Sequence, residues 1–487
     1  MRNVTVLSAL FAAGTIAQVQ PGQIQPAQVP APKMTASQAE AARAGAPFRQ
    51  FLAFLEAYNS GDRGRLTQFR DANYRTMNLD AQMSSREQSG GLELIGLDKA
   101  TDTRVQGYVL ERDTSQFGLF AMEVEPGEPH RVTRFAILPV RRPPEYPVVK
   151  MTEAEVVSAL RAKMDKDAAA GRFAGTVLLA KNGKVLFSGA YGMADREKKT
   201  PNTLDTKFRI GSMNKMFTAT SVLQLVQAGK IKLTDPLGKY ITDYPNQDVA
   251  TKVTIHQLLT HTGGTGDIFG PEFTAHRLEI KTLNDYISLF GKRAAEFEPG
   301  SRWVYSNYGM VLAGVVIERV SGQNYYDYVD EHIYKPAGMT RSGSPPESES
   351  ATGRSVGYTR AKQSGAWIPN TDTLPYRASS AGGGLSTVGD LLKFAEALMG
   401  HKLLNADYTD LLIAGKVNTS GGGRYAYGFE DGRKDGVGAV GHSGGAPGMS
   451  GDLRIYIPSG YAIAVLSNLD PPTAPQVSAF LDVRLPD

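Results

Sequence analysis

The most informative absence in this sequence is cysteine, which occurs at none of the 487 positions. A chain without thiols has no disulfide, no thiolate nucleophile, no cysteine-ligated zinc or iron-sulfur centre and no lipid attachment at an N-terminal cysteine. Nucleophilic catalysis in such a chain falls to another side chain, and serine is the first to consider.

An excess of one charge and a long apolar run are also missing. The 53 Lys and Arg nearly balance the 49 Asp and Glu, the net charge is +4, and no block of five like charges occurs. This excludes the electrostatic footprint of a nucleic-acid-binding protein. No stretch reaches the roughly 18 uninterrupted apolar residues of a membrane-spanning helix. We therefore expect neither a nucleic acid partner nor a membrane span, and the oligomeric state stays open.

The N-terminus has the pattern of an export signal. Arg2 precedes a short apolar run over residues 4–13, and residues 15–17 are small enough for cleavage. Residues 1–17 are predicted to be a signal peptide, which makes the protein periplasmic or secreted; a disordered apolar tail is the alternative. Residues 18–47 are rich in Gln, Pro and Ala and are predicted to be a linker.

The length and the glycine content constrain the rest of the chain. At roughly 100 to 200 residues per domain, a chain of 487 residues predicts two or three domains. The 52 glycines exceed the usual share of about 7%. Much of the backbone must therefore turn tightly or approach another group closely.

Residues 48–147 have the pattern of a small α+β domain. Phe51, Phe54 and Tyr58 recur at helical spacing before a turn, and another short helix begins near Leu66. Four β-rich runs separated by turn residues then predict an antiparallel meander over 92–97, 104–110, 117–124 and 131–138. A helix that ends in a Tyr-Asn-Ser-Gly-Asp turn before such a sheet resembles the cone-shaped fold of the nuclear transport factor family. An accessory or dimerising domain is predicted, and a small-ligand site is the alternative.

Residues 151–487 contain the side chains with catalytic potential. A helix over 151–170 and a hairpin that turns at 182–183 are predicted first. Ser212 and Lys215 then form the one Ser-x-x-Lys tetrapeptide of the chain, at the start of an apolar helix. Positions i and i+3 share a helix face, so the Lys215 amine can reach the Ser212 hydroxyl and take its proton. An exposed N-cap serine beside a solvated lysine is the alternative.

A second group places Tyr305 two residues before Asn307 and ahead of an apolar run over 310–317. A phenol can take part in proton transfer, and an amide can hold a substrate carbonyl or amide. Tyr244 and Asn246 have the same spacing and are the competing pair. A buried tyrosine with a purely structural hydrogen bond is the other alternative.

The third group is the glycine-rich segment Gly441-His442-Ser443-Gly444-Gly445, before an alternating run that predicts a strand over 453–457. Such small residues let a substrate lie against backbone amides. The segment also matches the G-x-S-x-G elbow of α/β-hydrolases, but that fold needs a histidine after the serine and none follows Ser443. His261, in a similar His-Thr-Gly-Gly segment, is interpreted as a loop residue after a short helix. Its spacing from His256 does not suit a metal site.

In this order, Ser212-x-x-Lys215, Tyr305-x-Asn307 and His442-Ser443-Gly444 resemble the three motifs of the penicillin-recognising serine hydrolases. The class C β-lactamase branch, with its related DD-peptidases, D-aminopeptidases and esterases, is the most similar. Shorter stretches that also resemble this branch are residues 208–211, 229–240, 258–264 and 381–387.

The resemblance implies a β-lactamase/transpeptidase-like fold, in which an antiparallel sheet flanked by helices lies beside a helical region. It implies that Ser212 is acylated and that Lys215 and Tyr305 share the proton transfers. The remaining implied site residues are the catalytic His442 and the substrate-binding Asn307, Ser443, Gly444 and Gly445. The amides of Ser212 and Gly445 would form the oxyanion hole, and neither a cofactor nor a metal is implied.

His442 stands where many members of that family have lysine. Lysine is cationic at neutral pH, whereas an imidazole with an ordinary pKa of about 6.5 is mostly neutral there. A neutral ring holds a substrate carboxylate less well, so we expect an esterase or peptidase with little β-lactamase activity. We also expect activity to change across about pH 6 to 7 as His442 titrates. A true class C-like β-lactamase and a slowly acylating penicillin-binding sensor are the alternatives.

Overall fold

The computed structural model describes residues 45–140, 142, 150–349, 351–361, 365–420, 422–433 and 436–486. The chain divides into two compact units, one up to Thr152 together with Ala479–Pro486, and one over Glu153–Ser478. The predicted signal peptide, 1–17, and nearly all of the predicted linker, 18–47, lie outside the described residues. Across the described ranges, no helix is both long and apolar enough to cross a membrane.

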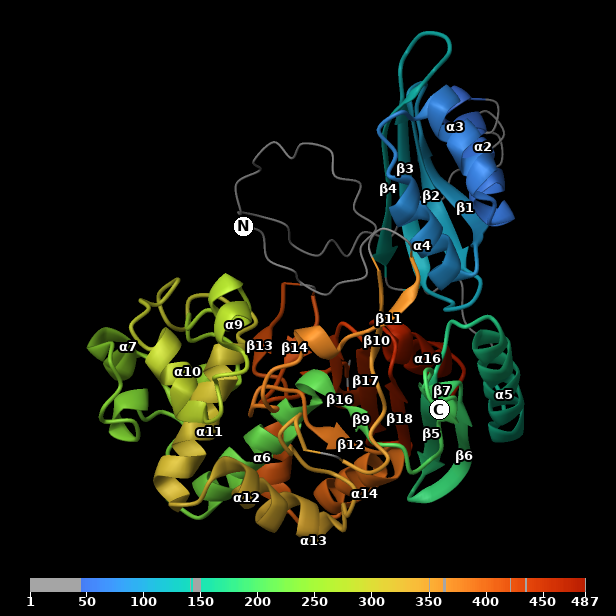
Figure 1. The fold of residues 1–487 in the computed structure, drawn as a ribbon. Helices are drawn as coiled ribbons and strands as arrows, with labels where there is room; N and C mark the ends of the chain where they lie inside the picture. Colours follow the sequence, from blue (N-terminus) through green and yellow to red (C-terminus); the bar gives the residue numbers. More distant parts are fainter. Residues whose placement is uncertain are drawn as a thin grey trace. The chain divides into compact units, whose positions relative to one another are not determined.

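The first unit packs helices against an antiparallel sheet with the strand order β1-β2-β3-β4 (Figure 1). The predicted meander is therefore confirmed. The helices are α2 (Ala46–Ser60), α3 (Arg63–Asn73) and α4 (Leu79–Ser89), and the strands are β1 (Leu92–Ala100), β2 (Arg104–Glu111), β3 (Phe117–Val124) and β4 (Val132–Val140). Helix α4 was not predicted, because its polar sequence has few apolar residues at helical spacing.

Aromatic residues of α2 form the centre of this unit. Phe51 and Phe54 are fully buried, and the ring of Phe51 stacks on Phe120 of β3 with centroids 3.7 Å apart. Helix α2 ends at Gly61, whose φ of 68° is a left-handed conformation that glycine adopts without strain. The resemblance to the nuclear transport factor cone stays a prediction.

The second unit contains an eight-stranded antiparallel sheet in the order β13-β14-β15-β16-β17-β18-β5-β6. Its strands are β5 (Gly175–Lys181), β6 (Lys184–Tyr191), β13 (Val417–Asn418), β14 (Arg424–Tyr425), β15 (Glu430–Asp431), β16 (Ala439–Ala446), β17 (Met449–Tyr456) and β18 (Tyr461–Ser467). Three two-stranded pairings accompany it, formed by β7 (Met193–Asp195) with β8 (Thr200–Pro201), β9 (Phe208–Arg209) with β12 (Leu385–Ser386), and β10 (Tyr358–Arg360) with β11 (Trp367–Pro369).

Buried β-branched residues in β5 and β18 and a tight turn between β5 and β6 account for the formation of these strands. Strand β18 is buried along its whole length, and β5 along all but its last residue, so both contribute to the core. The turn between β5 and β6 is Asn182-Gly183, with positive φ at both residues, as two-residue hairpins require. The predicted hairpin is confirmed. Helix α14 (Val388–Met399) packs on β18 and β5, and α5 (Glu153–Ala169) packs on β6.

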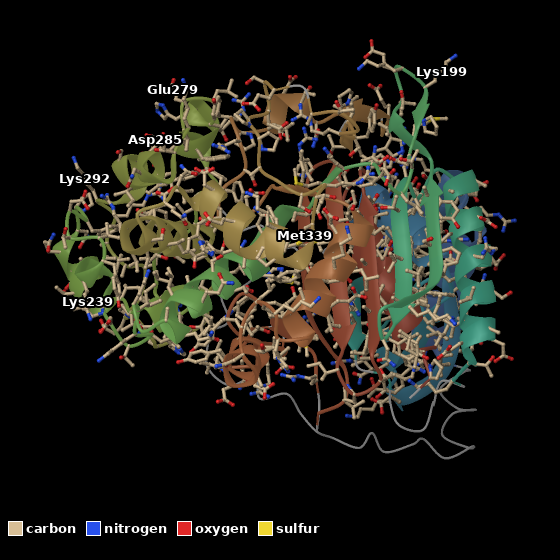
Figure 2. All side chains as sticks on the ribbon, turned by 90° about the horizontal axis from the view of Figure 1, so that it is seen from below. Lys199, Lys239, Glu279, Asp285, Lys292 and Met339 are labelled. Carbon is tan, nitrogen blue, oxygen red and sulfur yellow. The ribbon has the colours of Figure 1, made fainter. Side chains whose placement is uncertain are left out.

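A helical region lies beside the sheet (Figure 1). Its helices are α6 (Asn214–Gln227), α7 (Gln247–Lys252), α8 (Ile255–Leu259), α9 (Pro271–His276), α10 (Leu283–Phe290), α11 (Asn307–Ser321), α12 (Tyr325–Val329), α13 (Lys335–Ala337) and α15 (Ala406–Ile413); α16 (Thr473–Asp482) closes the chain. Most residues of α6 and α11 are buried, as expected of central helices. Figure 2 shows charged side chains such as Lys239 and Glu279 at the outer edge of this region.

Candidate active site

The predicted nucleophile lies where a single 3-10 turn, Gly211–Met213, leads into α6. Gly211 has a φ of 54°, and a Cβ added to it would stand 2.8 Å from the Gly445 nitrogen. Only glycine allows the turn to approach strand β16 this closely. Ser212 is half-buried at the N-terminal end of α6, where the helix dipole favours developing negative charge.

Lys215 is fully buried one helical turn after Ser212. Its Nζ lies 3.0 Å from Ser212 Oγ, 2.8 Å from Asn307 Oδ1 and 2.6 Å from the Ala381 carbonyl oxygen. The amide and carbonyl oxygens can only accept, so they take two N–H bonds and the third position of the nitrogen faces the serine hydroxyl. Burial lowers the pKa of Lys215 to about 7, and the charge of Asp267 opposes this shift. Near neutral pH, part of the protein therefore has a neutral amine directed at Ser212.

Asn307, the first residue of α11, connects Lys215 to the carboxylate of Asp267. The Ser306 side chain caps this helix by accepting from the Gly309 N–H. Asn307 Oδ1 accepts from Lys215, and Nδ2 donates to the two carboxylate oxygens of Asp267 at 3.0 and 3.2 Å. These bonds fix the orientation of the amide, so Asn307 positions the Lys215 amine. This role is independent of any contact between Asn307 and a substrate.

Tyr305 is half-buried just before α11, and Lys215 Nζ lies 4.7 Å from the centre of its ring. Burial raises the pKa of the phenol far above its ordinary value. A hydrogen bond with Ser212 opposes that rise, and the charges of Glu430 and Asp267 add to it. Tyr305 therefore keeps its proton at neutral pH and is a hydrogen-bond donor and acid rather than a base.

The competing pair lies elsewhere in the second unit. The Tyr244 hydroxyl is buried 3.2 Å from the hydroxyl of Tyr308, inside the helical core. Asn246 caps α7 by accepting from the backbone of Asp248 and Val249. The structure thus brings Tyr305, and not Tyr244, to Ser212 and Lys215.

The third predicted segment is strand β16, which packs against the turn that carries Ser212. A Cβ added to Gly444 would stand 1.9 Å from the Ile210 oxygen and 3.1 Å from the Ser212 nitrogen, so no side chain fits there. Gly445 is exposed, and its amide nitrogen lies beside Gly211. This close packing brings together the amides of Ser212 and Gly445, the two predicted oxyanion donors.

His442 is buried on β16 with both ring nitrogens engaged. Nδ1 contacts the Ser443 carbonyl oxygen, and the Tyr425 hydroxyl lies 2.9 Å from Nε2. Because a carbonyl can only accept, Nδ1 carries the proton and Nε2 accepts from Tyr425. Burial and, to a smaller extent, the Lys215 charge lower the pKa of His442 to about 3. The prediction that His442 titrates across about pH 6 to 7 is therefore wrong, because the ring is desolvated and stays neutral there.

Comparisons with known proteins identify the family. Residues 158–485 match the family model described as Beta-lactamase. The chain belongs to the beta-lactamase family. A penicillin-binding protein of Bacillus subtilis is 30% identical over 328 residues, which is 62% of this chain and 69% of that protein. The esterase EstB of Burkholderia gladioli is 33% identical over 204 residues, 39% of this chain and 52% of the esterase.

A solved structure agrees with this membership. The D-stereospecific amidohydrolase from Streptomyces sp. is 28% identical, with a TM-score of 0.57 over 68% of this chain and 98% of that one. The predicted β-lactamase/transpeptidase-like fold, the family resemblance and the serine hydrolase class are confirmed.

In this beta-lactamase family member, His261 contacts the candidate active site, although the sequence analysis predicted only a loop residue without a site role. It follows α8 as expected, but its ring centroid lies 4.4 Å from that of Tyr305 and 4.7 Å from that of Tyr425. The Ser306 N–H donates to Nδ1, so the ring proton is on Nε2. Burial holds the pKa of His261 well below 6.5. The histidine is a neutral support for the Tyr305 ring.

Two carboxylates beside the site were not predicted either. Asp267 binds Asn307 across 40 residues of sequence, and Glu430 accepts from Ser443 Oγ at 3.1 Å across 13 residues. Asp267 lies in a loop and Glu430 in a strand of only two residues, so no periodic pattern marks either acid. Only the contact with a motif residue identifies these acids, and that contact exists only in the folded chain.

Proposed function

We propose that this protein is an esterase or peptidase that cleaves ester or peptide-like amide substrates through an acyl-enzyme on Ser212. The observation that carries the proposal is the Lys215 amine, which is fully buried, has a pKa of about 7 and lies 3.0 Å from the Ser212 hydroxyl. The similarity to an esterase and to a D-stereospecific amidohydrolase supports the two bond types.

Acylation begins when neutral Lys215 takes the Ser212 proton. Ser212 Oγ then attacks the substrate carbonyl carbon, and the carbonyl oxygen becomes an oxyanion between the amides of Ser212 and Gly445. Removing one such donor in comparable enzymes costs about 100- to 1,000-fold in kcat. The glycines at 211 and 444 contribute by letting the two backbone segments meet.

Collapse of the tetrahedral intermediate needs an acid at the leaving group, and Tyr305 supplies it. The phenol holds its proton at neutral pH, and the Lys215 ammonium next to its ring can replace a donated proton. Deacylation repeats these steps with water in place of the serine hydroxyl. Lys215 then acts on the water, and Ser212 is the leaving group.

Low β-lactamase activity is the second part of this proposal. His442 is neutral, and both its ring nitrogens bind protein atoms, so it offers no cation to a substrate carboxylate. The Ser443 hydroxyl is already bonded to a carboxylate. We expect kcat/KM for p-nitrophenyl acetate to exceed that for nitrocefin by at least about 100-fold, the size of a lost charged contact of roughly 3 kcal/mol. Comparable values for the two substrates would falsify this part.

Mass spectrometry on wild type and Ser212→Ala tests the acyl-enzyme itself. A fluorophosphonate should add to Ser212 in the wild type and to nothing in the variant. Ester turnover that disappears in Ser212→Ala supports the hydrolase. A lasting penicillin adduct on Ser212 without ester turnover would instead identify a sensor, and turnover that survives in Ser212→Ala would exclude this nucleophile.

We also propose that the protein is periplasmic or secreted, on the charged start and apolar run within residues 1–17. Cell fractionation of the full chain and of a variant without residues 2–17 tests this. Activity outside the cytoplasm only for the full chain supports export. Equal distribution of the two proteins would contradict it.

A further inference from the structure

Glu430 is a carboxylate beside the site that the proposed reaction does not use. Its side chain is 54% exposed, and Oε1 lies 3.1 Å from Ser443 Oγ and 4.0 Å from His442 Nδ1. His442 is neutral, so it does not compensate this charge. Within the part of the chain that the structure describes, no lysine or arginine lies at ion-pair distance from Glu430.

The register of three strands places further charges around Ser443. Glu430 of β15 pairs with Gly441, and Arg454 of β17 pairs with the same glycine from the other side. Ser443 is two residues further on the same face, directly opposite Asp452. Arg454 Nε donates to Asp452 Oδ2 at 2.9 Å, so the guanidinium is engaged with that buried acid. Burial raises the pKa of Glu430 and the charge of Arg454 opposes this rise, so within the described residues Asp452 and Glu430 share this one guanidinium.

Glu430 lies near the proposed acid and the proposed oxyanion donor. Its charge raises the pKa of Tyr305, the phenol that protonates the leaving group. Ser443, which donates to Glu430, is two residues before the oxyanion donor Gly445, a separation of about 7 Å along an extended strand. A substrate carbonyl held at Gly445 would therefore bring groups a few bonds away within reach of the carboxylate.

We propose that Glu430 selects substrates that carry a positive charge within a few bonds of the scissile ester or amide, such as esters of amino alcohols. The proposal rests on the hydrolase function above and names its substrate class. A substrate ammonium would bind the half-exposed carboxylate, which within the described residues is hydrogen-bonded to the neutral Ser443. A substrate carboxylate at the same place would be repelled by Glu430 and would find His442 neutral.

Three thioesters with matched shapes test this. Acetylthiocholine has a cationic leaving group, 3,3-dimethylbutyl thioacetate is its neutral isostere, and S-acetyl-3-mercaptopropionate is anionic. We expect kcat/KM to fall in that order, with the cation preferred over the neutral ester by about five- to tenfold at low salt. The preference should shrink as salt rises, because a half-exposed carboxylate is screened.

Two variants separate Glu430 from a general charge effect. Glu430→Gln should lower the ratio of cationic to neutral kcat/KM about five- to tenfold from its wild-type value, since the amide keeps a partner for Ser443 without the charge and the intrinsic reactivities of the two thioesters cancel. Glu279→Gln removes an exposed carboxylate at the outer edge of the helical region and should leave the ratio as in the wild type (Figure 2). An unchanged ratio in Glu430→Gln would overturn the proposal.

Failure of the proposal differs from failure of the hydrolase. Equal turnover of the three thioesters by the wild type overturns selection by Glu430 and leaves the hydrolase intact. Absence of turnover, with no fluorophosphonate adduct on Ser212, overturns the hydrolase. In that case, calorimetric measurement of thioester binding to Ser212→Ala tests whether Glu430 selects cationic substrates. Tighter binding of acetylthiocholine than of its neutral isostere, lost on adding Glu430→Gln, supports the proposal, and equal binding overturns it.

Discussion

The two sides of the active site each bury one basic side chain, with opposite outcomes. On the helix side, burial lowers the pKa of Lys215 from 10.5 to about 7. On the strand side, burial lowers the pKa of His442 from 6.5 to about 3. Loss of water is the main cause in both. The lysine becomes a base that titrates near neutral pH, whereas the imidazole becomes a neutral group.

The comparison shows that the ordinary pKa of a basic side chain decides its protonation state at neutral pH after burial. A primary amine begins far enough above neutral pH to be useful after desolvation, and an imidazole does not. The remaining contacts fit these states. Lys215 has acceptors for two N–H bonds and a hydroxyl at the third position, while His442 has one acceptor and one donor.

The largest expected effect comes from removing the base on the helix side. Lys215→Met should lower kcat/KM for p-nitrophenyl acetate by about 100- to 10,000-fold, the range of general-base help. Steady-state kinetics checks the rate, and circular dichroism checks that the variant is folded. A folded Lys215→Met with wild-type kcat/KM would show that another group activates Ser212.

The pH profile should follow Lys215 and not His442. The base acts only when neutral, so kcat/KM should rise about tenfold per pH unit below 7 and level off above it. We expect His442→Asn to keep this midpoint near the pKa of about 7 of Lys215. A midpoint that disappears in His442→Asn would show that His442, and not Lys215, sets the pH profile. A wild-type profile that is flat from about pH 5.5 to 8.5 would contradict the assignment of Lys215 as the base.

A smaller effect is expected from the hydroxyl that supports His442. Tyr425→Phe leaves Nε2 of a buried imidazole without its donor, which costs about 1 to 3 kcal/mol of stability. Thermal unfolding of Tyr425→Phe should show a lower Tm than that of the wild type. The Tm of His261→Gln, which changes the other buried neutral ring, is measured for comparison. An unchanged Tm in Tyr425→Phe would mean that the bond to His442 contributes nothing.

The smallest effect is the acid sensitivity that His442 contributes. Its folded pKa of about 3 lies below its ordinary 6.5, so the unfolded chain binds a proton that the folded protein does not. Stability from this group is present above the ordinary pKa and is lost as pH falls towards 3. His442→Asn should therefore lose less Tm than the wild type between about pH 6.5 and 4. Parallel losses would show that the ring is protonated in both states or in neither.

Much of the fold could be read from local patterns. The meander of the first unit, the 182–183 hairpin and the helix after Ser212 all follow from side-chain periodicity and turn residues within a short window. Element boundaries were harder to predict: β17 starts at Met449, four residues before the predicted run, because Ser450 and Gly451 pair in the ladder without β-type side chains. Helix α4 was missed because capping and packing, and not an apolar stripe, define it.

The sequence by itself determined the candidate nucleophile and its candidate base, because Ser212 and Lys215 are neighbours on one helical turn and need no other element to meet. Only the tertiary structure decided the rest of the site. The choice of Tyr305 over Tyr244, the neutral state of His442, the contact of His261 and the carboxylates of Asp267 and Glu430 all depend on which distant segments pack together. Burial and charge act through space, and a linear pattern does not contain those distances.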